Sequence, residues 1–222
     1  MTCALRRPTL QNADMTVPSI VVAEQPLGLS EALNRFERYP PQTPAVYDYP
    51  GPGEPSGITT DEIRRTRKVS SRISAAEGDW FIALARRAPW TPAEGDLRDA
   101  APGESGGLYD SMLHLYAHFA GSAPKGVSTA KISKVLHLKR PNQFPILDSR
   151  VVRIYRKAAT REAATYTSRG NRRMYWAAIR SDLERSAAGL NELRTKMVAH
   201  PATRVQALQA VSDLRLLDML TW

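Results

Sequence analysis

A strongly basic segment that contains a carboxylate at a helix start is the most chemically suggestive feature of the sequence. Residues 125–180 carry 14 basic side chains against two acidic ones, a net charge of +12, while the 222-residue chain as a whole carries +9. A concentrated positive field attracts a polyanion, and nucleic acid is the commonest one. The alternatives are a solvated basic surface and an acidic protein partner. The basic residues are Lys125, Lys131, Lys134, Lys139, Arg140, Arg150, Arg153, Arg156, Lys157, Arg161, Arg169, Arg172, Arg173 and Arg180.

Asp148 stands among these cations, with Glu162 as the only other acidic residue of the segment. It opens a predicted helix in which Arg150 and Arg153 lie about one turn apart. An aspartate in this place is explained by a plain N-cap role. A catalytic or ligand-binding role for Asp148 is the alternative, and the residue types alone leave both open.

A tight turn before the predicted helix 127–138 is a second candidate for a binding site. Lys125 and Gly126 follow the predicted end of a helix at Gly121, and a new helix begins at Val127. Glycine permits a sharp backbone path, and the free amides at a helix N-terminus can hold a phosphate. Lys131 and Lys134 lie nearby as supporting cations.

The order of these features resembles the helix-hairpin-helix DNA glycosylase superfamily over about residues 108–157. Gly126-Val127-Ser128 occupies the hairpin position of that family, and Asp148-Ser149-Arg150-Val151 occupies its aspartate position. The resemblance implies that the hairpin grips a DNA phosphate. It also implies that the aspartate assists departure of a base, by supporting the cationic sugar or by activating the nucleophile.

Two departures from the family pattern bear on the reaction. Ser128 replaces the usual second glycine, and Ala130 stands where bifunctional members carry a nucleophilic lysine. Lys131 is the adjacent lysine, but on a helix it points about 100° away. We therefore expect a monofunctional glycosylase with water as the nucleophile, if the protein is an enzyme. The catalytic candidates are Asp148 and Lys131, and the nucleic-acid-binding candidates are Lys125, Gly126, Val127, Ser128, Lys134, Arg150, Arg153, Arg172 and Arg173.

The whole chain also resembles an uncharacterised actinobacterial family of unknown function. The segments that carry this likeness are SKVLHLKRPNQFPILDSRVVRIY and VSDLRLLDMLTW. This second resemblance implies no activity. The functions to weigh are thus a DNA-binding protein with glycosylase chemistry, a non-catalytic nucleic-acid-binding module, and a small helical protein that binds an acidic partner. Duplex DNA is the expected partner, and the sequence leaves the oligomeric state open.

In the segments that must position these residues, apolar side chains recur mostly at helical spacing. We therefore expect an all-α fold with one compact helical domain over 29–222. Residues 1–28 lack periodicity and are expected to form a flexible arm. Residues 39–57 contain six prolines and are expected to be an extended loop. The predicted helices span 31–38, 60–74, 79–88, 108–120, 127–138, 146–157, 172–188, 190–199 and 203–220.

Several classes of protein are excluded or disfavoured by composition. Cys3 is the single cysteine, so no disulfide or cysteine cluster can form within one chain, and this fits the reducing cytoplasm. No apolar run approaches the ~20 residues of a membrane span, and we expect no membrane partner. His114 and His118 share a helix face but no third ligand is evident, so we expect neither a metal nor a cofactor.

Overall fold

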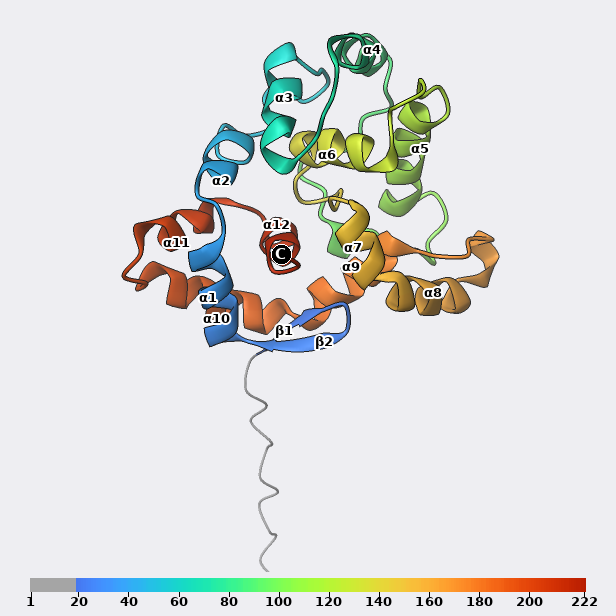
Figure 1. The fold of residues 1–222 in the computed structure, drawn as a ribbon. Helices are drawn as coiled ribbons and strands as arrows, with labels where there is room; N and C mark the ends of the chain where they lie inside the picture. The colour runs from blue at the N-terminus through green and yellow to red at the C-terminus, as the bar shows by residue number, and fades with distance from the viewer. Residues whose placement is uncertain (1–18) are drawn as a thin grey trace, which may run out of the picture.

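Helices make up most of the chain that follows a short N-terminal β-hairpin. The computed structural model describes residues 19–222, which form a two-stranded sheet and twelve α-helices (Figure 1). The expected all-α class is therefore confirmed. No helix in this range is long and apolar enough to cross a membrane. The elements are β1 (Ser19–Val22), β2 (Gln25–Gly28), α1 (Leu29–Arg38), α2 (Gln42–Tyr47), α3 (Thr60–Arg65), α4 (Ala75–Ala85), α5 (Leu108–Ala120), α6 (Thr129–Lys139), α7 (Ser149–Ile154), α8 (Arg156–Thr165), α9 (Tyr175–Arg185), α10 (Ala187–Val198), α11 (Thr203–Ala207) and α12 (Asp213–Met219).

The hairpin corrects the expectation of a flexible arm over its last ten residues, while residues 1–18 lie outside the described part. Ile20 pairs with Leu27 across the two strands, and both side chains are buried in the core. Ala23 and Glu24 form the turn with φ values of 50° and 67°. Tight two-residue hairpins need this left-handed conformation, which Asn-Gly usually supplies. The usual sequence signal for the turn is therefore missing here.

The hairpin is held against helices from the far end of the sequence. The Val21 N–H donates to Ser186 Oγ (2.8 Å), and the Glu24 N–H donates to Asp182 Oδ2 (3.3 Å). Gly189 in α10 allows the close approach, because a Cβ atom there would lie 2.2 Å from the backbone oxygen of Ser19. The N-terminal strand thus depends on a glycine 170 residues away in the sequence.

The proline-rich segment is also not extended throughout, so that prediction is wrong for residues 42–47, which form α2. Pro44 lies in the first turn, where backbone N–H groups have no partner within the helix and proline costs no hydrogen bond. Tyr47 at its end is buried and donates its hydroxyl to the backbone oxygen of Lys134 (2.6 Å). The burial of Tyr47 fixes this segment on α6.

Helix boundaries differ from the predictions where capping and breaks intervene. A reciprocal capping box at Thr59 starts α3 at Thr60, as predicted, but α3 ends at Arg65 instead of residue 74. A second capping box at Ser74 starts α4 at Ala75 instead of Asp79. The predicted helix 203–220 is interrupted, because a 3-10 turn and an extended residue at Val211 separate α11 from α12. This break lets α12 turn into the interior, where Figure 1 shows it at the centre of the molecule.

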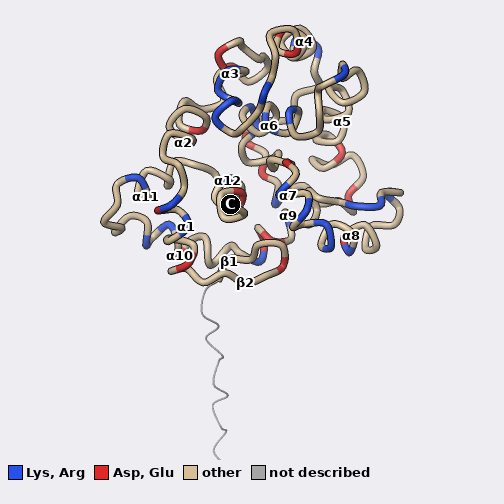
Figure 2. The backbone as a smooth tube through the Cα atoms, in the orientation of Figure 1, with Lys and Arg blue, Asp and Glu red and all other residues tan. Residues whose placement is uncertain are grey.

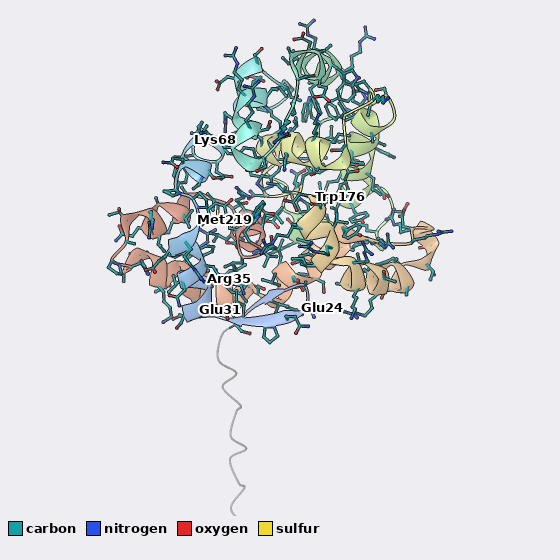
Figure 3. All side chains as sticks on the ribbon, viewed as in Figure 1. Glu24, Glu31, Arg35, Lys68, Trp176 and Met219 are labelled. Carbon is teal, nitrogen blue, oxygen red and sulfur yellow. The ribbon has the colours of Figure 1, made fainter. Side chains whose placement is uncertain are left out.

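Aromatic residues of the basic segment belong largely to the core. Trp176, which is labelled in Figure 3, is 6% exposed. It packs edge-on against Tyr109, Tyr116 and Phe144, with ring centroids 5.3–6.0 Å apart. Such edge-to-face pairs stabilise beyond the burial of their area. Trp176 is therefore a structural residue and not a surface on which a nucleic-acid base could stack.

We predict that Gly189→Ala destabilises the protein, because the new Cβ would overlap the Ser19 backbone. Overpacking of this kind costs about 1–3 kcal/mol of unfolding free energy, which exceeds the helix-propensity gain of alanine. Urea denaturation measures the difference. Gly28→Ala is the matched control, since nothing lies within 4 Å of a Cβ there and its φ is −69°. Equal stability of the two variants would contradict the prediction.

Candidate functional site

A small pocket lined by charged side chains is the strongest candidate for a functional site. Its volume is about 120 Å³, and it lies where the start of α2, the 3-10 turn Thr66–Val69, the middle of α6, the N-terminus of α7 and the helix α12 meet. The charged and hydroxyl-bearing residues of its wall are Tyr39, Thr43, Lys68, Ser70, Lys134, Asp148, Arg215 and Asp218. Segments from both ends of the chain thus build one polar cavity.

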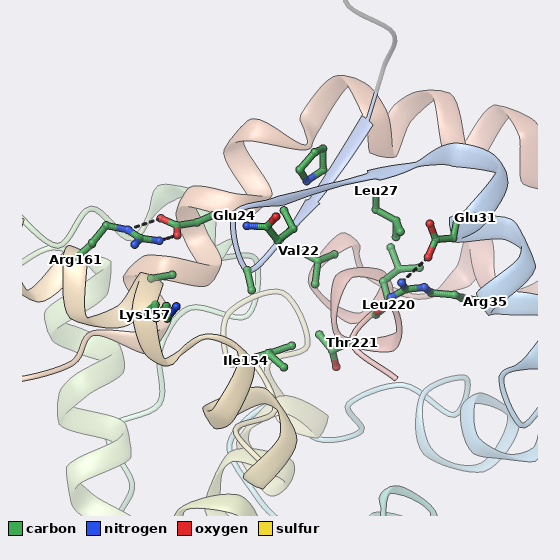
Figure 4. Close-up of a pocket in the computed structure, with 14 residues that line it drawn as sticks. Val22, Glu24, Leu27, Glu31, Arg35, Ile154, Lys157, Arg161, Leu220 and Thr221 are labelled. Carbon is green, nitrogen blue, oxygen red and sulfur yellow. Dashed lines mark hydrogen bonds and ion pairs between the residues drawn. The ribbon is translucent and has the colours of Figure 1, made fainter.

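A larger groove of about 580 Å³ runs along the hairpin, α7, α8 and residues 220–221 (Figure 4). The acidic side chains in its wall are already paired, Glu24 with Arg161 and Glu31 with Arg35. Both pairs are partly exposed to solvent, where an ion pair contributes little. We therefore place the candidate site in the smaller pocket, because four of its charged residues, Lys134, Asp148, Arg215 and Asp218, are buried.

Asp148 both caps a helix and lines the pocket. Its Oδ1 atom accepts hydrogen bonds from the N–H groups of Arg150 and Val151, each at 2.9 Å, which start α7. Its Oδ2 atom accepts no hydrogen bond from residues 19–222. The side chain is only 9% exposed. The carboxylate is thus fixed by one oxygen and free to interact with a ligand through the other.

Lys134, and not Lys131, is the lysine that the fold brings to Asp148. Lys134 is 5% exposed and lines the pocket, and its ammonium forms no ion pair within residues 19–222. Burial lowers its pKa, while the charges of Asp148 and Asp218 oppose that shift. Lys131 lies one turn earlier, outside the pocket. The sequence named both lysines, but it could not show which of them faces Asp148.

Lys131 instead anchors the turn before α6 to the start of α4. Its ammonium lies 2.6 and 2.8 Å from the two carboxylate oxygens of Glu77, the third helical residue in the capping box of α4. This contact lowers the pKa of Glu77. The expected catalytic role of Lys131 gains no support from this position, because its charge is already neutralised.

The turn itself has the backbone path that the sequence indicates. Gly126 has a φ of 103°, and a Cβ there would lie 2.9 Å from Glu77 Oε1. Val127 packs against the core, and Ser128 caps α6 through the N–H of Lys131 (3.4 Å). None of these residues lines the Asp148 pocket, and Lys125 is exposed. The turn and the pocket are therefore separate features.

Arg215 is the buried centre of the pocket floor. It is 1% exposed, its Nε lies 3.0 Å from Asp48 Oδ1, and its Nη1 donates to Asp218 Oδ2. Its guanidinium also lies over the rings of Tyr39 and Tyr47, 5.9 and 5.4 Å from their centroids. Despite the opposing effect of burial, these acidic partners raise the pKa of Arg215. The charge of Arg215 is therefore permanent.

Burial raises the pKa of Asp218 to about 6, which the nearby charge of Asp148 reinforces and Arg215 opposes. Its Oδ1 atom is buried and has no hydrogen-bond partner within residues 19–222. Burial also raises the pKa of Asp48, against the effect of Arg215. No spacing signal in the sequence connects Asp218 to Asp148.

More than half of the basic residues of the segment are buried or bonded to other parts of the fold. Lys139 is buried against Glu62 (2.6 Å), and Arg140 donates to the backbone oxygen of Thr91 (2.9 Å). Arg150 donates to the backbone oxygens of Thr221 and Trp222. Arg161, Arg169 and Arg180 pair with Glu24, Asp110 and Glu184. Figure 2 shows that Lys and Arg are spread over most helices and do not form one band.

Six cations of the segment are exposed and have neither an acidic partner nor a side-chain hydrogen bond among the residues that the structure describes. Three of them lie on α7 and α8, and two lie in the loop before α9. They are Lys125, Arg153, Arg156, Lys157, Arg172 and Arg173. Fewer cations are therefore available to a polyanion than the net charge of +12 indicates.

We predict that Arg215→Met lowers the unfolding free energy by about 3–5 kcal/mol, because it leaves Asp48 and Asp218 buried without their cation. Thermal or urea unfolding near neutral pH measures the loss. The loss shrinks at acidic pH, where the two carboxyls bind protons and need no cation. Arg204→Met is the control, because Arg204 is exposed and unpaired in the described chain, and it should change stability by less than about 0.5 kcal/mol. Equal stabilities would contradict the central role of Arg215.

Comparison with known proteins gives one match. Residues 84–222 match a family that is described as "Family of unknown function (DUF6308)". No curated protein and no solved structure is significantly similar to the chain. The likeness to helix-hairpin-helix glycosylases thus gains no support, whereas membership of an uncharacterised family is confirmed. The match spans more than half of the sequence and includes Lys134, Asp148, Arg215 and Asp218, so the chain belongs to the DUF6308 family of unknown function.

Proposed function

We propose that the protein acts on DNA and that the Asp148 pocket is where it cleaves the bond between a base and its sugar. The observation that carries this proposal is that the two oxygens of the Asp148 carboxylate have different surroundings. Oδ1 is fixed by two backbone N–H groups, while Oδ2 has no partner in the described chain. A preorganised carboxylate with one free oxygen stabilises the positive charge that develops on a sugar as its base departs.

The size and polarity of the pocket support a small heterocyclic ligand. A volume of about 120 Å³ is well below the ~300–1,000 Å³ of sites for drug-sized ligands, so the pocket suits a group of one or two rings. Lys134 and Tyr39 offer hydrogen-bond donors, and Asp218 Oδ1 has no hydrogen-bond partner within residues 19–222. A base enters such a pocket only after it is rotated out of the duplex.

The partner in this proposal binds through the six exposed cations defined above. Of these, Lys157 lies at the edge of the groove along α8. Because these residues have no acidic partner in the described chain, their charge is available to phosphates. The same cations support the second candidate, a nucleic-acid-binding module without catalysis, and catalytic assays separate the two.

We predict that Asp148→Asn lowers base release by about 100-fold or more, because the amide is neutral. Asparagine still caps α7, so stability and duplex affinity are retained. Release is measured on duplexes that carry uracil, hypoxanthine, 8-oxoguanine or 3-methyladenine. Asp96→Asn is the control, since Asp96 also caps a turn but lies outside the pocket.

Equal release by the Asp148→Asn variant and the parent protein would overturn the catalytic proposal. If the parent releases no base from any of these duplexes but binds them, the non-catalytic module is the better account.

We predict that the triple variant Arg153→Gln, Arg156→Gln, Lys157→Gln binds duplex DNA more weakly and with a shallower salt dependence. Each lost phosphate contact reduces the slope of log affinity against log salt by about 0.9. Fluorescence anisotropy over a range of salt concentrations measures both quantities. The triple variant Arg86→Gln, Arg87→Gln, Arg204→Gln removes the same charge from other exposed sites and serves as the control. Equal slopes for the two variants would contradict binding through α7 and α8.

A further inference from the structure

We infer that Asp218 is the general acid of the Asp148 pocket and gives its proton to the departing base. This inference rests on the proposed function and assigns a distinct role to the second carboxyl group. It concerns a residue on α12, some 70 positions beyond Asp148 in the sequence.

The geometry of Asp218 is that of a group prepared for a ligand. The residue is 6% exposed and lines the cavity, and Arg215 Nη1 holds its Oδ2 atom. Its Oδ1 atom is buried and receives no hydrogen bond from residues 19–222. A buried polar atom without a partner costs free energy unless a proton or ligand satisfies it. Asp218 Oδ1 is therefore the free position of this side chain.

The surroundings of the two carboxyls differ. Asp148 Oδ1 accepts hydrogen bonds from two backbone N–H groups, whereas Asp218 Oδ1 accepts none from residues 19–222. Asp218 is buried with Asp148 nearby, and the resulting pKa of about 6 keeps a proton available near neutral pH. The other charged or titratable groups around it are Lys134 on α6, Lys68 in the 3-10 turn, Tyr39 after α1, Tyr47 on α2, Tyr155 after α7, and Asp48 and Arg215. Two carboxyls with divergent environments are the usual basis for separate acid and base roles.

The reaction balances with these two groups and one water molecule. As the bond from the sugar carbon to the base nitrogen breaks, its electron pair goes to the base, and Asp218 transfers its proton to a ring nitrogen. The carboxylate of Asp148 faces the cationic sugar. Water then attacks the sugar carbon and gives a proton to Asp148. Asp148 releases this proton to solvent, and Asp218 takes up a proton from solvent, so both carboxyls return to their starting states. The products are a free base and an abasic sugar.

The experiment compares the pH dependence of base release by the parent protein, Asp218→Asn and Asp48→Asn. Because the acid must be protonated, parent release falls as pH rises through the pKa of Asp218. Asp218→Asn lowers release by about 100-fold and removes this alkaline decline. Asp48→Asn also removes an acidic partner of Arg215 but lies outside the pocket wall, so it keeps the alkaline decline.

A second measurement needs no activity. Carbon-13 NMR of aspartate carboxyls in the ligand-free protein follows the protonation of Asp218 directly, and Asp218→Asn assigns the signal. A raised midpoint supports the inference, and an ordinary aspartate midpoint overturns it. Release that keeps its alkaline decline in Asp218→Asn overturns the acid role while the proposed function stands. Absence of release from every duplex overturns both.

Discussion

The buried guanidinium of Arg215 is the interaction on which the candidate site depends. It joins Asp48 and Tyr39, which lie 167 and 176 positions earlier in the sequence, to Asp218 on its own helix. Desolvating one arginine and two carboxylates is costly, and only hydrogen bonds to several partners offset that cost. The arrangement therefore fixes α12 against Tyr39 and Asp48, which lie on either side of α2, and so holds one part of the pocket wall in place. Without Arg215 the remaining buried carboxylates would repel each other.

The pocket combines residues from inside and outside the region that matches the family. Residues 84–222 supply Lys134, Asp148, Arg215 and Asp218, whereas Tyr39, Asp48 and Lys68 precede the matched region. The two carboxyls to which we assign the reaction, and the buried cations beside them, thus belong to the matched region. The earlier residues close the cavity and complete the partners of Arg215.

The sequence predicted the helical class and singled out Asp148, because helical periodicity and a helix-start carboxylate are local signals. It could not assign Asp218 or Arg215 to the same cavity, since the contacts between them and Asp48 span most of the chain. The hairpin was missed because Ala23 and Glu24 are not typical turn residues. α2 was missed because Pro44 lies in the first turn, where proline does no harm. Charge counting overstated the binding surface, since partners such as Glu62 for Lys139 lie 77 positions away.

The contact between Glu77 and Lys131 has a consequence for the turn at Gly126. The same carboxylate completes the capping box of α4, neutralises Lys131 and lies beside the glycine that gives the turn its shape. The turn therefore already carries an anion of its own. A phosphate that approached the turn would meet a negative charge and a lysine that is already paired. In electrostatic terms, Lys125 is the one nearby cation in the described chain that the turn leaves to another anion, and the charge of Lys131 is satisfied from within.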